Sequence, residues 1–115
     1  MTFETDRELN YDIKTRIISD DAAFGPGVAR IMTLVKETNS LSRAYESMGL
    51  SSSKGWRIIK EAEECLGFPL FLTTIGGKDG GSTKLTKEGE QLLAKYQSFV
   101  DELNKEAEKL FNKYF

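Results

Sequence analysis

The sequence of 115 residues contains no histidine and a single cysteine, Cys65. Without histidine, a Ser-His-Asp or Cys-His catalytic triad cannot form, and one cysteine cannot build a zinc finger or a disulfide framework. We therefore expect no catalytic site, no metal site and no cofactor, and we expect Cys65 to be a small buried residue.

Long apolar runs are also absent. No stretch approaches the roughly 18 apolar residues that a membrane-spanning helix needs. The polar start, Met1 to Leu9, does not combine a basic region with an apolar one, as a secretory signal would. We expect a cytoplasmic protein with no membrane partner, and a flexible N-terminus at residues 1–9.

Basic residues are fewer than acidic ones, 16 against 18, but they are unevenly distributed. Residues 25–60 contain six basic and two acidic side chains, whereas residues 61–69 contain three acidic side chains and no basic one. A nucleic-acid-binding domain needs a basic face rather than a basic average. The distribution is compatible with such a face and with ordinary fluctuation of charge.

The hydrophobic pattern predicts three helices in quick succession. Pro26 suits a first helical turn, and apolar residues then recur at helical spacing to about Thr38. A short helix follows at residues 43–48, with Ser42 as the expected N-cap and Gly49 after its end. The third helix spans residues 52–66. A short helix, a glycine-containing turn and a further helix are the layout of a helix-turn-helix.

The helix at residues 52–66 has two distinct sides. At about 100° per residue, one side is apolar, and we expect Trp56 on it to be a core residue packed against the two preceding helices. Its outer face is cationic in the first turns, with Ser53, Lys54, Arg57 and Lys60, and acidic later, with Glu61 and Glu64. The apolar side is formed by Gly55, Trp56, Ile58, Ile59, Ala62, Cys65 and Leu66.

The next segment is typical of a β-hairpin. Residues 70–75 are β-prone, residues 76–81 form a glycine-rich loop, and residues 82–85 return as a second strand. Attached to a helix-turn-helix, this hairpin is a wing. Residues 10–18 alternate between apolar and polar, so we expect Tyr11, Ile13 and Ile17 to cover the wing as a third strand; an exposed edge that pairs with a partner is the alternative.

The C-terminal helix, residues 88–115 with Thr86 as its cap, has a heptad pattern. Apolar residues every seven positions, in two rows three apart, are typical of a coiled-coil seam. We expect this helix to pair two copies of the chain, with folding back on its own core as the alternative. The seam consists of Leu93, Tyr96, Val100, Leu103, Ala107, Leu110 and Tyr114.

Several of these segments together resemble a known family. Residues 25–27, 39–44 and 48–51, together with Trp56, are similar to the N-terminal domain of ModE-type molybdate-responsive transcription regulators. The strongest likeness is in residues 76–89, which resemble that family's glycine-rich wing and the start of its next helix. The resemblance covers about residues 10–105 and extends more distantly to the helix-turn-helix of LysR-type regulators.

The resemblance implies a mainly α fold with a small antiparallel β-sheet. It implies a winged helix-turn-helix at residues 10–87, followed by a long C-terminal dimerisation helix at residues 88–115. In the family the third helix reads the major groove and the wing touches the DNA backbone. Carried over by position, the groove contacts are Ser52, Ser53, Lys54 and Arg57, and the wing contact is Lys78.

The charges add two further phosphate contacts, Lys60 and Lys84. The expected function is sequence-specific binding of double-stranded DNA as a homodimeric transcription regulator. Family members usually continue into molybdate-binding domains, whereas this sequence ends at Phe115, so we expect no molybdate site on this chain. The alternative is a winged-helix protein-interaction module that no longer binds DNA. Thr73, where the family usually has a basic residue, and the isoelectric point near 5.2 favour this alternative.

Overall fold

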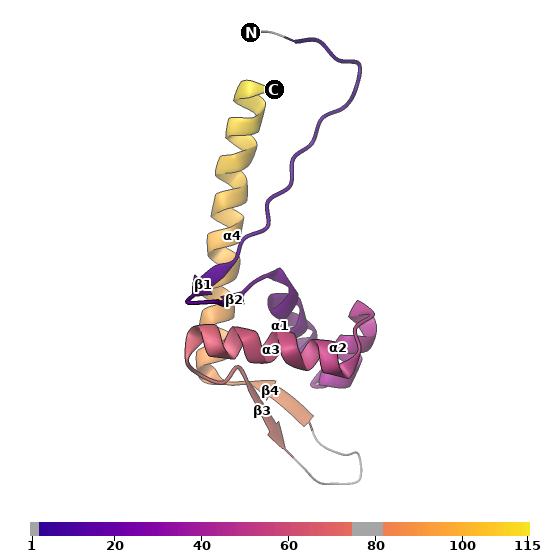
Figure 1. Cartoon of the computed structure of the whole chain (residues 1–115), viewed down its shortest axis with the longest axis vertical. Helices are drawn as coiled ribbons and strands as arrows, with labels where there is room; N and C mark the ends of the chain where they lie inside the picture. The colour runs from indigo at the N-terminus through magenta and orange to yellow at the C-terminus, as the bar shows by residue number, and fades with distance from the viewer. Residues whose placement is uncertain (1–2, 75–81) are drawn as a thin grey trace.

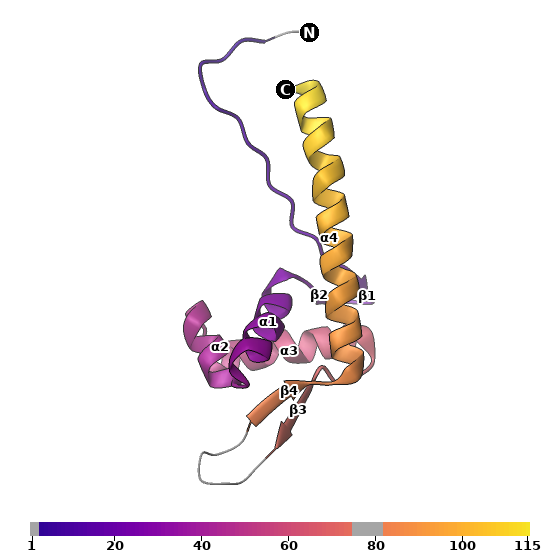
Figure 2. The ribbon, with the colours of Figure 1, turned by 180° about the vertical axis from the view of Figure 1, so that it is seen from behind.

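The computed structural model describes residues 3–74 and 82–115. Helices α1 to α3 and two small hairpins form a globular part, from which the long helix α4 projects with the N-terminal segment alongside it (Figure 1). The same arrangement is seen from behind in Figure 2. The elements in chain order are β1 Ile17–Ser19, β2 Ala22–Phe24, α1 Pro26–Thr38, α2 Leu41–Met48, α3 Ser52–Leu66, β3 Phe71–Thr74, β4 Ser82–Leu85 and α4 Lys87–Tyr114.

The helix boundaries follow local capping chemistry, and most were predicted. The side-chain oxygen of Ser51 accepts a hydrogen bond from the backbone N–H of Lys54, and Thr86 does the same at the start of α4. The expected cap of α2, Ser42, was wrong. Ser40 has the extended backbone of a cap and accepts from the N–H of Arg43 at 3.1 Å, so α2 begins two residues before the predicted start.

The predicted third strand of the wing was also wrong. β1 pairs with β2 through a tight turn in which Asp20 has a φ of 51°, while β3 pairs with β4 in a separate sheet. Among the described residues, Tyr11 and Ile13 belong to no strand. Alternation indicates an extended backbone but does not select its partner. Here the partner is α4, where the Tyr96 hydroxyl donates to the carbonyl of Thr15 at 2.8 Å.

The hydrophobic core lies beneath α1 and includes Leu93 and Tyr96, which hold the first part of α4 against the globular part. Helix α1 buries the apolar stripe that its sequence predicted, and Phe24 and Leu70 close the core beside it. The rings of Phe24 and Tyr96 meet edge to face, with centroids 5.0 Å apart. Burial raises the pKa of Tyr96 above its ordinary value. The buried residues of the α1 stripe are Val28, Ala29, Ile31, Met32, Leu34 and Val35.

Gly89 sets how closely α4 approaches Leu70, the residue that leads into β3 of the wing. A Cβ at this position would lie 2.7 Å from the backbone oxygen of Leu70, which itself accepts from the N–H of Thr86. Backbone atoms cannot move aside as a flexible side chain can. We therefore expect Gly89→Ala to lower the free energy of unfolding by about 1–3 kcal/mol, although alanine is the better helix former.

Thermal or urea unfolding tests this expectation, with Glu90→Ala as the matched control one residue further along α4. Glu90 is exposed, and its replacement is expected to change stability by less than about 0.5 kcal/mol. A Gly89→Ala variant as stable as the parent would show that α4 is not held against Leu70 in this way.

Candidate nucleic-acid interface

The turn between α2 and α3 places α3 directly on α2. Helix α2 ends at Gly49, whose φ of 67° is left-handed, and the N–H of Leu50 then donates to the carbonyl of Tyr45. The ring of Tyr45 fills the space beside Gly55, where a Cβ would overlap it. Burial of the ring raises the pKa of Tyr45 above its ordinary value. This contact fixes which side of α3 faces the core.

The buried line of α3 runs through Gly55, Ile59 and Ala62. The opposite side therefore points outward and carries the predicted contacts from this helix. Lys54, Arg57 and Lys60 line one shallow surface depression together with Glu61 and Glu64. Cations thus lie along the first half of the outer face, and carboxylates along the second. The exposed predicted contacts on α3 are Ser52, Ser53, Lys54, Arg57 and Lys60.

Among the described residues, Lys60 differs from Lys54 and Arg57 in having an ion-pair partner. Its ammonium lies 3.2 Å from one carboxylate oxygen of Glu63, and the other oxygen of Glu63 accepts from the N–H of Leu70 at 2.7 Å. An exposed ion pair of this kind contributes at most about 1 kcal/mol, so it restrains Lys60 only weakly. The carboxylate of Glu63 nevertheless offsets part of the charge of Lys60, so Lys54 and Arg57 are the stronger candidates for contact with a phosphate.

The wing contributes one described cation, Lys84. It is exposed on β4, opposite Leu72 of β3, while its neighbours Thr83 and Leu85 are buried. The predicted wing-tip contact, Lys78, lies outside the described residues. Cys65 is buried, as expected, and its thiol lies 3.4 Å from the carbonyl oxygen of Ile17, to which it donates.

The prediction that Trp56 is a core residue was wrong, because its side chain is 58% exposed. Trp56 follows Gly55 by one residue, about 100° around the helix, and so it lies at the edge of the apolar arc rather than at its centre. Its ring borders a concave patch with Ser52, Ser53 and Arg57. Gly55 marks the place where α3 approaches α2 most closely. An apolar side of the helix centred on Gly55 places Trp56 at its edge, so this glycine was the signal that could have predicted the exposure of Trp56.

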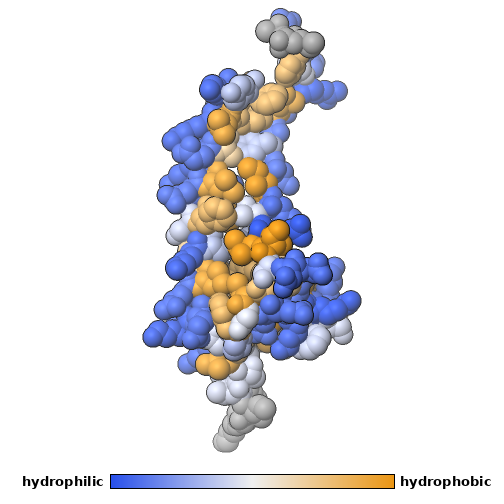
Figure 3. All heavy atoms as spheres, turned by 60° about the vertical axis from the view of Figure 1, so that its left-hand side comes forward, coloured by the Kyte–Doolittle hydropathy of each residue, from blue (hydrophilic) through white to orange (hydrophobic). Residues whose placement is uncertain are grey.

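The heptad residues of α4 fall into two groups. Leu93 and Tyr96 are buried in the core of their own chain. The later positions are only partly covered or are exposed, with Leu110 at 54% and Tyr114 at 68%. Figure 3 shows hydrophobic side chains following the column of α4 and the N-terminal segment down to the globular part. The partly covered positions are Val100, Leu103 and Ala107.

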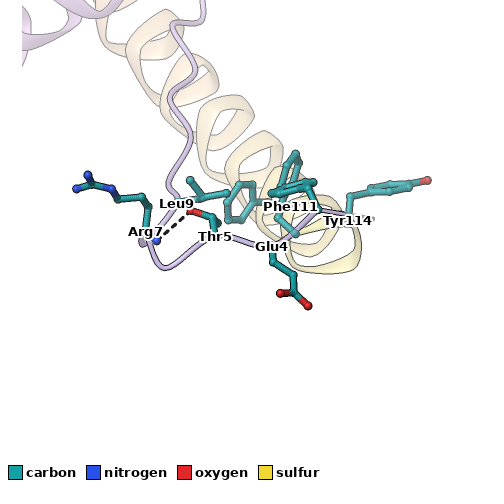
Figure 4. Close-up of a pocket in the computed structure, with 8 residues that line it drawn as sticks. Glu4, Thr5, Arg7, Leu9, Phe111 and Tyr114 are labelled. Atoms are coloured by element: carbon teal, nitrogen blue, oxygen red, sulfur yellow. Dashed lines mark hydrogen bonds between the residues drawn. The ribbon is translucent and has the colours of Figure 1, made fainter. Parts of the chain in front are cut away.

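A pocket of about 620 Å³ lies at the far end of α4, away from α3. Figure 4 shows Leu9 of the N-terminal segment and Phe111 of α4 among its lining residues. The rings of Phe111 and Phe115 stack with centroids 5.1 Å apart, and Phe3 lies beside Phe115. The pocket therefore lies where the N-terminal segment meets the end of α4, and it shares no lining residue with the depression on the cationic face of α3.

Comparison with known proteins identifies the domain. A family model described as "Bacterial regulatory helix-turn-helix protein, lysR family" matches residues 29–90, more than half of the chain. The chain belongs to this family. The match in this LysR-family protein runs from α1 through the wing into the start of α4. Its helix-turn-helix is thus a DNA-binding domain of regulators rather than a domain of enzymes. Among the described residues, no helix is both long and apolar enough to cross a membrane.

Three curated proteins are similar to the LysR-family chain. The molybdenum-pterin-binding protein MopB of Rhodobacter capsulatus is 32% identical over 65% of this chain and 28% of its own length. The molybdenum transport protein ModE of Herbaspirillum seropedicae is 33% identical over 56% of this chain and 24% of its own. ModE of Azotobacter vinelandii is 27% identical over 70% of this chain and 30% of its own length. The resemblance to ModE-type proteins is confirmed as distant homology, and the chain spans less than a third of these relatives.

Proposed function

We propose that this protein is a homodimeric transcription regulator that binds double-stranded DNA with sequence preference. In this proposal the first half of α3 enters the major groove, and the wing, with Lys84 and Lys78, lies on the sugar-phosphate backbone. The observation that carries the proposal is the segregation of charge on the outer face of α3. Lys54 and Arg57 are exposed near the N-terminus of the helix, and the exposed carboxylates follow them.

Each group on this face has a distinct chemical use. Backbone N–H groups at a helix N-terminus attract a phosphate, and Lys54 adds a full positive charge beside them. Arg57 can donate two parallel hydrogen bonds to a guanine edge, which is worth about 1–3 kcal/mol of discrimination. The hydroxyls of Ser52 and Ser53 bind phosphates or base edges without strong selectivity. The expected sequence preference is therefore modest.

The second half of α4 supports the dimer in this proposal. Leu93 and Tyr96 are engaged within the chain, so the pairing surface is the part of the seam from Val100 onward, with Phe99 beside it. This part projects beyond the globular core, and the N-terminal segment runs alongside it (Figure 2). A two-fold axis along it would present two copies of α3, spaced about 34 Å apart to match one turn of DNA.

Titration of dye-labelled duplex DNA with the protein, followed by fluorescence anisotropy at several salt concentrations, tests the proposed function. We expect binding at low salt and a linear fall of log K with log salt, because phosphate contacts release counterions. The absence of binding to any duplex at low salt would contradict it. That result would instead favour a winged-helix module for protein partners, which the exposed Thr73 in the wing and the acidic isoelectric point near 5.2 also suggest.

A further inference from the structure

We propose that the indole ring of Trp56 is itself a DNA-contact group, which packs in the major groove against the 5-methyl groups of thymine. The inference rests on the proposed function, since it assigns a further residue and a base preference to the same surface. Trp56 is unusually exposed for a tryptophan. Tryptophan is among the largest apolar side chains and is highly buried on average, yet Trp56 is 58% exposed.

The ring lies among the groups already expected to meet DNA. Together with Ser52, Ser53 and Arg57 it lines a shallow hollow of about 520 Å³ at the start of α3. None of these four residues carries a negative charge. An apolar ring within a cationic and hydroxyl-rich patch is complementary to a polyanion that also presents apolar methyl groups, and the thymine methyl in the major groove is such a group.

The position of Trp56 around α3 places it on the side where the wing begins. Glu63 follows Trp56 by seven residues, so the two side chains leave the helix on nearly the same side. Glu63 accepts the N–H of Leu70, the residue that leads into β3. Figure 1 shows the hairpin β3–β4 extending away from α3. A duplex that touches both the first half of α3 and the wing therefore meets the flank that carries Trp56.

The ammonium of Lys60, which also pairs with Glu63, lies over the ring of Trp56. The ammonium is 5.7 Å from the centroid of this ring, one helical turn along α3. A cation over the face of the indole leaves the edge of the ring directed outward. The edge offers apolar carbon atoms for a methyl contact and one N–H that can donate to an acceptor in the groove or to a phosphate.

The sequence provides a direct reporter, because Trp56 is the only tryptophan. Binding is measured by the anisotropy of a dye-labelled duplex of alternating A and T, and tryptophan emission is recorded separately with the unlabelled duplex. A second duplex replaces every thymine by deoxyuridine, which removes only the 5-methyl groups. We expect the thymine duplex to shift and quench the emission of Trp56, and the deoxyuridine duplex to bind about three- to tenfold more weakly.

Trp56→Ala is expected to bind the thymine duplex about tenfold more weakly than the parent and to bind both duplexes equally. Ile18→Ala is the matched control, because Ile18 is also an exposed apolar side chain, at 69% against 58% for Trp56, and is located on β1 rather than on α3. Its affinity and its thymine preference are expected to stay at the parent values. Circular dichroism and thermal unfolding show whether both variants are folded, which their surface positions predict.

The outcomes separate this inference from the proposed function. If no duplex binds, the proposed function fails. If duplexes bind with unchanged tryptophan emission, or if Trp56→Ala binds as the parent does, the inference is overturned while the proposed function stands. Equal affinity of the parent for the thymine and deoxyuridine duplexes also overturns it.

Discussion

Replacing Lys54 and Arg57 together by alanine is expected to raise the Kd for duplex DNA at least about a hundredfold at low salt. Both side chains are exposed on the first half of α3, and a dimer presents each of them twice. Each lost phosphate contact lowers the slope of log K against log salt by about 0.9. The variant should therefore bind weakly at low salt, and its affinity should fall less steeply with salt than that of the parent, since Lys60, Lys78 and Lys84 remain. Anisotropy titrations in a salt series measure both quantities.

The control removes the same charge from a different surface. Lys95 and Lys105 are exposed on α4, and their joint replacement by alanine changes the net charge as the α3 variant does. Charges that lie more than a Debye length, about 10 Å at 0.1 M salt, from the bound phosphates are largely screened. We expect a change of less than about threefold. Equal losses in the two variants would mean that overall charge, and not the face of α3, determines binding.

The second large effect is expected at the far part of α4. Placing aspartate at Leu103 and Leu110 would bury two charges per chain in the proposed pairing surface. One buried, unpaired charge costs several kcal/mol, so the dimer should dissociate into monomers at micromolar concentration. A monomer contacts DNA with one α3 instead of two, and the loss of the second site should reduce the affinity about 10²- to 10⁴-fold. Analytical ultracentrifugation and the anisotropy assay measure the two effects.

Aspartates on the outer side of α4 provide the matched control. Positions 105 and 112 lie opposite the heptad seam, and both side chains are exposed. Lys105→Asp with Asn112→Asp should leave the molecule dimeric. A parent protein that is a stable monomer at micromolar concentration, or a Leu103→Asp, Leu110→Asp variant that stays dimeric, would exclude this part of α4 as the pairing surface.

Much of the fold could be predicted because its signals are local. Pro26, the apolar stripe of α1, and the caps Ser51 and Thr86 act within a turn or two of the chain, and each boundary they indicated is observed. The two β-prone runs around the glycine-rich loop predicted the wing, whose strands Phe71–Thr74 and Ser82–Leu85 pair as expected. The hydrophobic periodicity of residues 52–66 alone predicted which side of α3 faces outward.

The predictions that were wrong concern contacts between segments that are distant in the sequence. The alternation at residues 10–18 could not show that the chain would run beside α4 instead of pairing with the wing. The heptad pattern treated Leu93 as equivalent to Leu110, yet one packs in the core and the other projects beyond it. The apolar arc of residues 52–66 predicted a buried Trp56, whereas Tyr45 already occupies the space where α2 meets α3.

Site-specific cross-linking to duplex DNA tests the central claim, that the first half of α3 lies on DNA, most directly. A photo-reactive amino acid is introduced singly at Ser53, at Glu64 near the end of the same outer face, and at Lys105 on α4. All three side chains are exposed, so the substitutions should not disturb folding. We predict strong cross-links from position 53, few from position 64 and none from position 105. Cross-links from position 64 or 105 with none from position 53 would contradict this account.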